Sequence, residues 1–177
     1  MNLDREAASN VPAHYVDLIY QQVDMCLREI TKKEHELILR VGDESIPVSY
    51  KTARHQCRVR VTNKGHRASG GIRGVTIDIA NHNFPYAFVS EYKRIANDPV
   101  IGSTDTIGPQ LTLFAVVAHE VAHHIQRRYA WMTRIYKNGD FKPHGQVWQD
   151  VYRILRSRVV NPRIDVYLAL RDQRLAA

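Results

Sequence analysis

The chain carries the stretch LTLFAVVAHEVAHHIQ at residues 111–126. Its apolar residues recur at the spacing of a helix with one buried side, and they are Leu111, Phe114, Ala115, Ala118, Ala122 and Ile125. Pro109 suits a first helical turn and Asn138-Gly139 suits a stop, so we expect a helix over about residues 109–137.

Two histidines of this stretch, His119 and His123, are four residues apart. Both rings then lie on one face of the helix, about one turn apart, and can reach a single tetrahedral metal ion. Glu120 completes the pattern HExxH, which is typical of zinc proteases and in which the glutamate takes a proton from a metal-bound water. The alternative is a core helix with surface histidines and Glu120 as a solvated charge.

A catalytic zinc site needs a third protein ligand and leaves the fourth position to water. A metzincin would have glycine at position 126 and histidine at position 129, and this chain has neither. No glutamate follows Glu120, which leaves His144, Asp140 and Asp150 as candidates. We favour His144 because it is the only histidine after the segment HEVAHHIQ and opens an amphipathic stretch with helical spacing.

The segments HEVAHHIQ at residues 119–126 and HGQVW at residues 144–148 resemble the SprT-like family, whose members include the Spartan DNA–protein crosslink proteases. Members of this family carry HExxH on one helix and a third histidine in an H-G-x-x-aromatic segment that opens the next helix. The resemblance implies that the zinc ligands are His119, His123 and His144 and that the catalytic base is Glu120.

The resemblance covers about residues 10–160, with one clear departure. Many family members have a C-terminal zinc ribbon built from four cysteines, whereas this chain has only Cys26 and Cys57. Any nucleic-acid contact that the ribbon makes in those members must be absent here or supplied by another surface.

Length and composition indicate one globular domain over residues 1–177, with 44% apolar and 24% charged residues. No apolar run approaches the roughly 20 residues of a membrane span, and the polar N-terminus is unlike a signal peptide. Two cysteines make no disulfide framework, so we expect a cytoplasmic protein that does not bind membranes.

Positive charge is concentrated in residues 45–77, which contain no aspartate or glutamate. The seven basic residues there are Lys51, Arg54, Arg58, Arg60, Lys64, Arg67 and Arg73. Their charge equals the net +7 of the whole chain, and such a block is a candidate contact for a polyanion.

The basic block also has the alternation of β-strands. Residues 57–62 and 74–80 each place apolar side chains on one face, and the loop-like residues 63–71 lie between them. We expect a hairpin with an arginine-bearing outer face that contacts DNA phosphates, through Arg54, Arg58, Arg60, Lys64, Arg67 and Arg73. The alternative is an ordinary solvated face of a sheet.

The remaining pattern predicts an α+β domain of the minimal zincin-like type that the resemblance implies. Helices are expected at residues 11–40, 86–96 and 144–159, with a tail helix after the break at Asn161-Pro162. Strands are expected at residues 46–52, 57–62 and 74–80. The plan is therefore an N-terminal helix, a small three-stranded sheet, an active-site helix and a third-ligand helix.

We expect zinc-assisted hydrolysis of a peptide that lies extended along an exposed edge strand at residues 74–80. An oxyanion needs a donor, for which Tyr129, Tyr136 and Tyr152 are candidates. His124 lies about 100° around the helix from His123, so we expect it to support the site or face solvent rather than bind the metal.

Two other functions fit the same residues. A nucleic-acid-binding module with a structural zinc would need a closed site, with His124, Asp140 or Asp150 as fourth ligand. A protease specific for one regulator would cleave its partner without DNA. A protease of DNA-crosslinked proteins would instead be stimulated by DNA and inhibited by salt.

Overall fold

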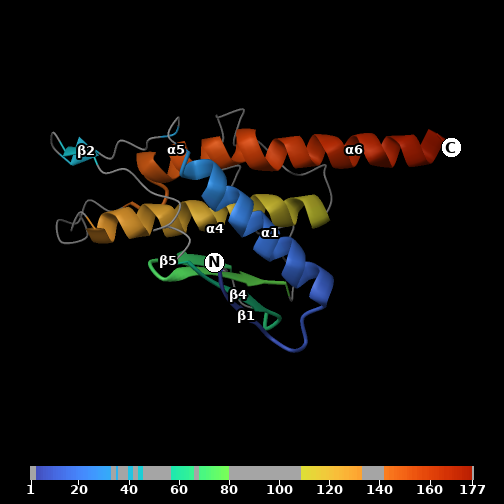
Figure 1. Cartoon of the computed structure of the whole chain (residues 1–177), viewed down its shortest axis with the longest axis horizontal. Coiled ribbons are helices and arrows are strands. Elements are labelled where there is room, and N and C mark those ends of the chain that lie inside the picture. Colours follow the sequence, from blue (N-terminus) through green and yellow to red (C-terminus); the bar gives the residue numbers. More distant parts are fainter. Residues whose placement is uncertain are drawn as a thin grey trace.

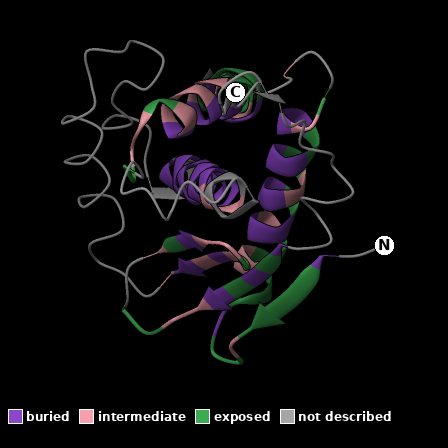
Figure 2. Ribbon diagram, turned by 90° about the vertical axis from the view of Figure 1, so that its left-hand side faces the viewer, coloured by how far each residue is buried: buried purple, intermediate pink, exposed green. Residues whose placement is uncertain are grey.

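A small sheet forms one layer of the molecule, and helices cover one of its faces (Figures 1 and 2). The computed structural model describes residues 3–32, 35, 40–41, 44–45, 57–65, 68–79, 109–132 and 142–176. The helices on the sheet are α1 (Ala13–Ile30) and α4 (Pro109–Met132), and those beyond them are α5 (Gln146–Leu155) and α6 (Asn161–Ala176). The chain therefore has the mixed α+β architecture that the sequence predicts.

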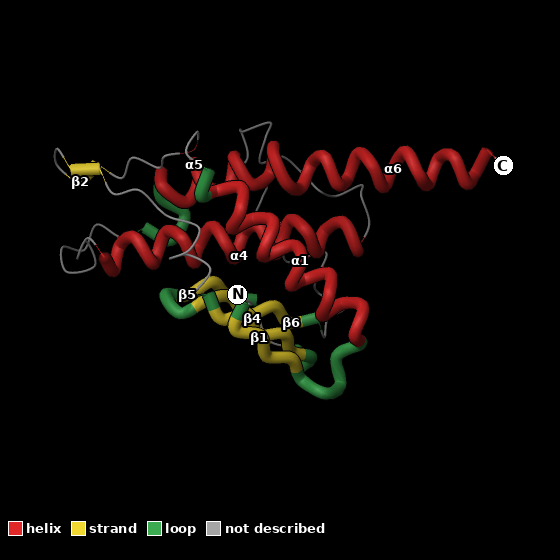
Figure 3. The backbone as a smooth tube through the Cα atoms, viewed as in Figure 1, coloured by secondary structure: helices red, strands yellow, loops and turns green. Residues whose placement is uncertain are grey.

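The main sheet has four strands in the order β1-β4-β6-β5 (Figure 3). Their bounds are β1 (Asp4–Ala7), β4 (Arg58–Thr62), β5 (Ser69–Gly71) and β6 (Gly74–Asp78). Strands β1, β4 and β6 are parallel, and β5 is antiparallel to β6. A separate antiparallel pair joins β2 (Arg40–Val41) to β3 (Glu44–Ser45).

The predicted hairpin of residues 57–62 and 74–80 is wrong, because β4 and β6 run parallel. The hairpin partner of β6 is β5, which the sequence pattern assigned to a loop. Strand β5 has the sequence Ser-Gly-Gly and pairs through its backbone, so it leaves no trace in side-chain alternation. Gly74 begins β6 with a φ of 148°, a conformation that favours glycine, and a side chain there would clash with the backbone of Arg58.

The prediction of a three-stranded sheet missed β1, a charged strand that pairs with β4 at the edge of the described sheet. All four residues of β1 are exposed, so they show none of the alternation by which a half-buried strand is recognised. The strand expected at residues 46–52 and the helix expected at 86–96 lie outside the described residues.

Helix α1 ends at Ile30, ten residues before the predicted end. The chain turns there because the hydroxyl of Thr31 and the amide of Lys32 bond back to carbonyls of the last turn. The carboxylate of Glu29 holds the next residues through Lys32 and His35, at 2.6 and 2.8 Å. Burial alone would raise the pKa of Glu29, but these two partners outweigh burial and lower it.

The chain stays helical where a break at Asn161-Pro162 was predicted. A five-residue π-helical segment, η3 (Arg156–Val160), joins α5 directly to α6. Pro162 is the second residue of α6 and directly follows the π-helical segment. None of the helices in the described part of the chain is both long and apolar enough to cross a membrane.

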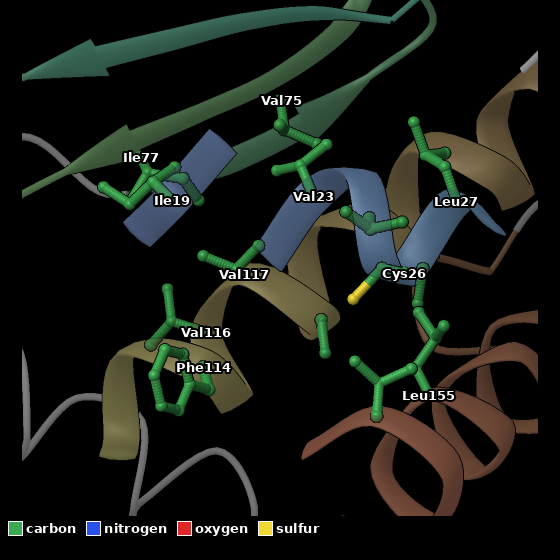
Figure 4. Packing of buried hydrophobic residues seen from close by; sticks show 14 of the residues in the cluster. Ile19, Val23, Cys26, Leu27, Val75, Ile77, Phe114, Val116, Val117 and Leu155 are labelled. Atoms are coloured by element: carbon green, nitrogen blue, oxygen red, sulfur yellow. The ribbon is translucent and has the colours of Figure 1, made fainter. Parts of the chain in front are cut away.

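The core lies between the sheet and the helices, where side chains of α1, α4, α5 and β6 point toward one another (Figure 4). The predicted alternation of β4 and β6 is confirmed: Val59, Val61, Val75 and Ile77 are buried, whereas Arg58, which precedes Val59 on β4, is exposed. The two cysteines, Cys26 and Cys57, are buried free thiols. Burial raises the pKa of the Cys57 thiol to about 12.

Candidate metal centre

Three imidazole rings converge on one point between α4 and the start of α5. The Nε2 atom of His123 lies 3.1 Å from Nε2 of His119 and 3.0 Å from Nε2 of His144. The third side of the triangle, between His144 and His119, is 3.5 Å. A tetrahedral ion held at about 2.05 Å by imidazole nitrogens would separate them by about 3.3 Å. Three histidines thus form a cluster in which a metal ion could bind.

Helix α4 supplies two of the three rings from its buried face. His119 and His123 are four residues apart in a helix that begins at Pro109, as predicted. They are 2% and 7% exposed, and Glu120 between them is 5% exposed. Because α4 is covered by the sheet on one side and α5 on the other, these polar side chains are held inside the protein (Figure 2).

The third ring comes from the short segment before α5. Gln126, one turn after His123 on α4, donates from Nε2 to the carbonyl of Lys142 at 2.8 Å. Gln149 donates from its side-chain amide to the carbonyl of His144 at 3.1 Å. The segment that carries His144 is therefore anchored to both helices, which fixes the third ring relative to the other two.

Trp148 forms the buried wall behind the three histidines. Its ring centre lies 4.8 Å from that of His119 and 4.6 Å from that of His144. The indole N–H donates to the carbonyl of His119 at 3.3 Å, and the ring of Tyr152 stacks on the indole with 4.8 Å between ring centres. From the sequence, Trp148 was expected as an apolar residue of the third-ligand helix and as the aromatic residue of the H-G-x-x-aromatic segment, with no role of its own at the site. Its position four residues after His144, in a segment expected to be helical, was the signal that could have identified it.

No fourth histidine, cysteine, aspartate or glutamate joins the cluster within the described ranges. Asp150 is engaged with Arg153 and Gln146, at 3.0 and 2.8 Å. His124 directs its Nδ1 atom to a backbone carbonyl on the sheet, and Asp140 lies outside the described residues. Among the described residues the cluster thus offers three nitrogen donors, and a tetrahedral ion held by three protein ligands leaves its fourth position to water or a substrate oxygen.

Strand β5 lies directly against the part of α4 that bears the histidines. A Cβ atom on Gly70 would lie only 2.0 Å from the carbonyl oxygen of Glu120 and 2.7 Å from Cβ of His123. His124 is fully buried and donates from Nδ1 to the carbonyl of Gly71 at 2.6 Å. Burial lowers the pKa of His124, which favours the neutral ring.

The edge strand beside the cluster is β5, and the expectation that residues 74–80 form this edge is wrong. Strand β6 pairs with β4 along its whole length and with β5 over Gly74–Thr76, so this part of β6 has a neighbouring strand on both sides. In the described sheet the outer edges belong to β5 and β1. Of these two, β5 packs on α4.

The predicted basic surface is partly neutralised. Strand β1 brings Asp4 to 2.8 Å from Arg58 and Glu6 to 3.1 Å from Arg60. The absence of carboxylates from residues 45–77 was therefore misleading, because parallel pairing supplies them from the N-terminus.

The other basic residues do not form one hairpin tip. Lys64 follows the end of β4 and Arg73 precedes the start of β6, at opposite ends of these parallel strands. Both are exposed, whereas Arg54 and Arg67 lie outside the described residues. The buried carboxylate of Asp78 accepts hydrogen bonds from the backbone amides of Lys64 and Gly65 at 3.0 and 3.1 Å, so the start of this loop is held in place.

Of the three tyrosines considered as oxyanion donors, Tyr152 is the one whose side chain lies among the described residues. It is fully buried within the core cluster and stacks on Trp148. The side chain of Tyr129 and the whole of Tyr136 lie outside the described residues.

Comparisons of the chain with protein-family models, curated proteins and solved structures gave no match.

Proposed function

We propose that this chain is a zinc-dependent endopeptidase of the SprT-like type, with a minimal zincin-like fold, that acts on proteins bound or crosslinked to DNA. The observation that carries the proposal is the convergence of the Nε2 atoms of His119, His123 and His144 to within 3.0–3.5 Å. Two of these residues belong to an HExxH pattern, and the third comes from a separate segment. An uncharged three-nitrogen donor set suits zinc.

Three donors rather than four among the described residues favour a catalytic role over a structural one. The chemistry that zinc supplies when bound at such a site is activation of a water molecule and polarisation of the scissile carbonyl. Glu120 accepts the proton of the attacking water and donates it to the leaving amine. Trp148 and Tyr152 exclude bulk water from the back of the histidine cluster, since both are fully buried.

The substrate peptide pairs with the outer edge of β5 as an added strand. This edge is the one that packs on α4, next to Glu120 and His123. Strand addition satisfies the backbone of an extended peptide irrespective of its side chains. A protease that degrades varied DNA-bound proteins benefits from recognition of this kind.

Contact with DNA falls to exposed basic residues. Pairing of Arg58 and Arg60 with Asp4 and Glu6 leaves exposed Lys64 and Arg73 as candidates in the described residues, together with Arg54 and Arg67. The same ion pairs favour the second candidate, a protease that cleaves one regulatory protein without DNA.

The test is cleavage of a protein crosslinked to DNA, with and without added single-stranded DNA, by wild type and Glu120→Gln. The zinc content of both proteins is measured first, since the substitution leaves the three histidines in place. Cleavage that depends on Glu120 and rises with DNA supports the full proposal. Glu120-dependent cleavage that ignores DNA supports the regulator-specific protease. Zinc-loaded wild type without cleavage on any substrate overturns the enzyme assignment and points to a binding module.

A further inference from the structure

His124 makes a specific connection between the helix of the metal site and the edge of the sheet. Its ring is fully buried and donates from Nδ1 to the carbonyl oxygen of Gly71 at 2.6 Å. The other ring nitrogen, Nε2, is buried with no hydrogen-bond partner among the described residues. The hydrogen bond to Gly71 is thus the polar contact that the structure gives this side chain.

The acceptor belongs to a strand with little stability of its own. Strand β5 has three residues, Ser69, Gly70 and Gly71, and it pairs with β6 in the described sheet. Glycine in a strand loses more conformational entropy on ordering than other residues and has no side chain to pack. An ordered edge at this place therefore needs contacts from outside the sheet.

Two contacts from α4 supply that support, one on each of two neighbouring residues. Gly70 lies so close to α4 that an added Cβ would meet the carbonyl oxygen of Glu120 at 2.0 Å. This contact limits how near the strand can approach. The hydrogen bond from His124 to Gly71 limits how far it can move away. Because His124 follows His123 directly, these two contacts fix the position of β5 relative to a residue of the candidate metal site.

We propose that His124 is a positioning residue that holds the peptide-binding edge of β5 at a fixed distance from the metal centre. This inference rests on the proposed peptidase function. Its substrate class is an extended polypeptide long enough to pair with β5. A substrate too short to pair with β5 gains no binding energy from this strand, so its cleavage does not depend on His124.

The test compares wild type with His124→Phe and His124→Asn. Phenylalanine keeps a ring of similar volume and removes the donor, whereas asparagine places an amide N–H near the position of Nδ1. For a long unfolded polypeptide we expect KM to rise about tenfold in His124→Phe, with a smaller change in kcat. His124→Asn is expected to restore KM to within about twofold of wild type, because it keeps the donor. Zinc content stays at the wild-type level in all three.

A second readout does not require activity. Hydrogen exchange of the backbone amides in residues 69–76 is expected to be faster in His124→Phe than in wild type and His124→Asn. Unchanged exchange and KM in His124→Phe would overturn the proposal, as would loss of zinc in both variants. If wild type cleaves no substrate, the peptidase function fails, while the exchange measurement still decides whether His124 holds β5.

If His124→Phe does not fold, His124→Gln takes its place. Glutamine carries its amide at the position of Nε2, away from the carbonyl of Gly71, so the β5 amides of this variant should exchange faster than those of His124→Asn. Equal exchange in these two variants would contradict the proposed role of the Nδ1 donor.

Discussion

At Gly70 the absence of a side chain lets β5 lie against the carbonyl of Glu120. We predict that Gly70→Ala lowers the free energy of unfolding by about 1–3 kcal/mol, because backbone rather than a flexible side chain must give way. The matched control is Gly71→Ala, where the nearest heavy atom would lie 3.7 Å from the new Cβ, an ordinary distance. Urea denaturation of both variants measures the difference. Equal stability would show that β5 shifts on α4 without cost.

Gln126 acts on the third histidine from a distance, through the carbonyl of Lys142. We predict that Gln126→Leu lowers zinc affinity about tenfold, because the segment that carries His144 loses its anchor to α4. Gln146→Leu is the control, since Gln146 bonds Asp150 on an exposed face of α5. Competition with a chromophoric chelator measures both affinities. A similar loss in the two variants would argue against a specific anchor.

At the scale of elements, the pairing of β1 with β4 changes the meaning of the basic block. We predict that the double variant Asp4→Asn, Glu6→Gln binds single-stranded DNA more tightly than wild type, because Arg58 and Arg60 lose their partners. Each additional phosphate that these arginines neutralise would steepen the dependence of log affinity on log salt by about 0.7. The exposed Asp17 on α1 offers the control Asp17→Asn, which changes charge without freeing an arginine of β4. The control removes one negative charge and the double variant removes two, so equal tightening per removed charge would mean that net charge alone is responsible.

Periodicity predicted best the elements that carry a side-chain pattern of their own. The start of α4 at Pro109 and the buried faces of β4 and β6 follow from patterns that each segment carries by itself. Strands β1 and β5 escaped prediction because one is charged and exposed and the other is mostly glycine. Strand β1 forms by pairing with β4, which is distant in sequence. Strand β5 forms by pairing with β6, which carries the alternating side-chain pattern that β5 lacks.

At the scale of the whole molecule, the candidate metal site lies between helix α4 and the segment before α5. His119 and His123 lie on α4 and His144 precedes α5, so a bound ion would join segments that the core packs together. We predict that zinc at 100 times its dissociation constant raises the free energy of unfolding by about 2.7 kcal/mol over the metal-free protein. Calorimetry with and without chelator measures the shift. Glu120→Gln should show a shift of similar size, whereas His144→Ala should show a much smaller one.

The sequence by itself identified the three histidines as candidate metal ligands. It also determined the helix that carries two of them and the alternating faces of two strands. His119, His123 and the strand faces follow from local spacing, which a helix or a strand converts directly into one face. His144 was indicated instead by the amphipathic segment that it opens and by the family resemblance. Only the tertiary structure decided the parallel order of the sheet, the neutralisation of Arg58 and Arg60 and the placing of β5 beside Glu120. Those features depend on backbone pairing and on close approach between distant segments. Such interactions leave no periodic signal in the chain, because glycine backbones and exposed carboxylates meet their partners only after folding.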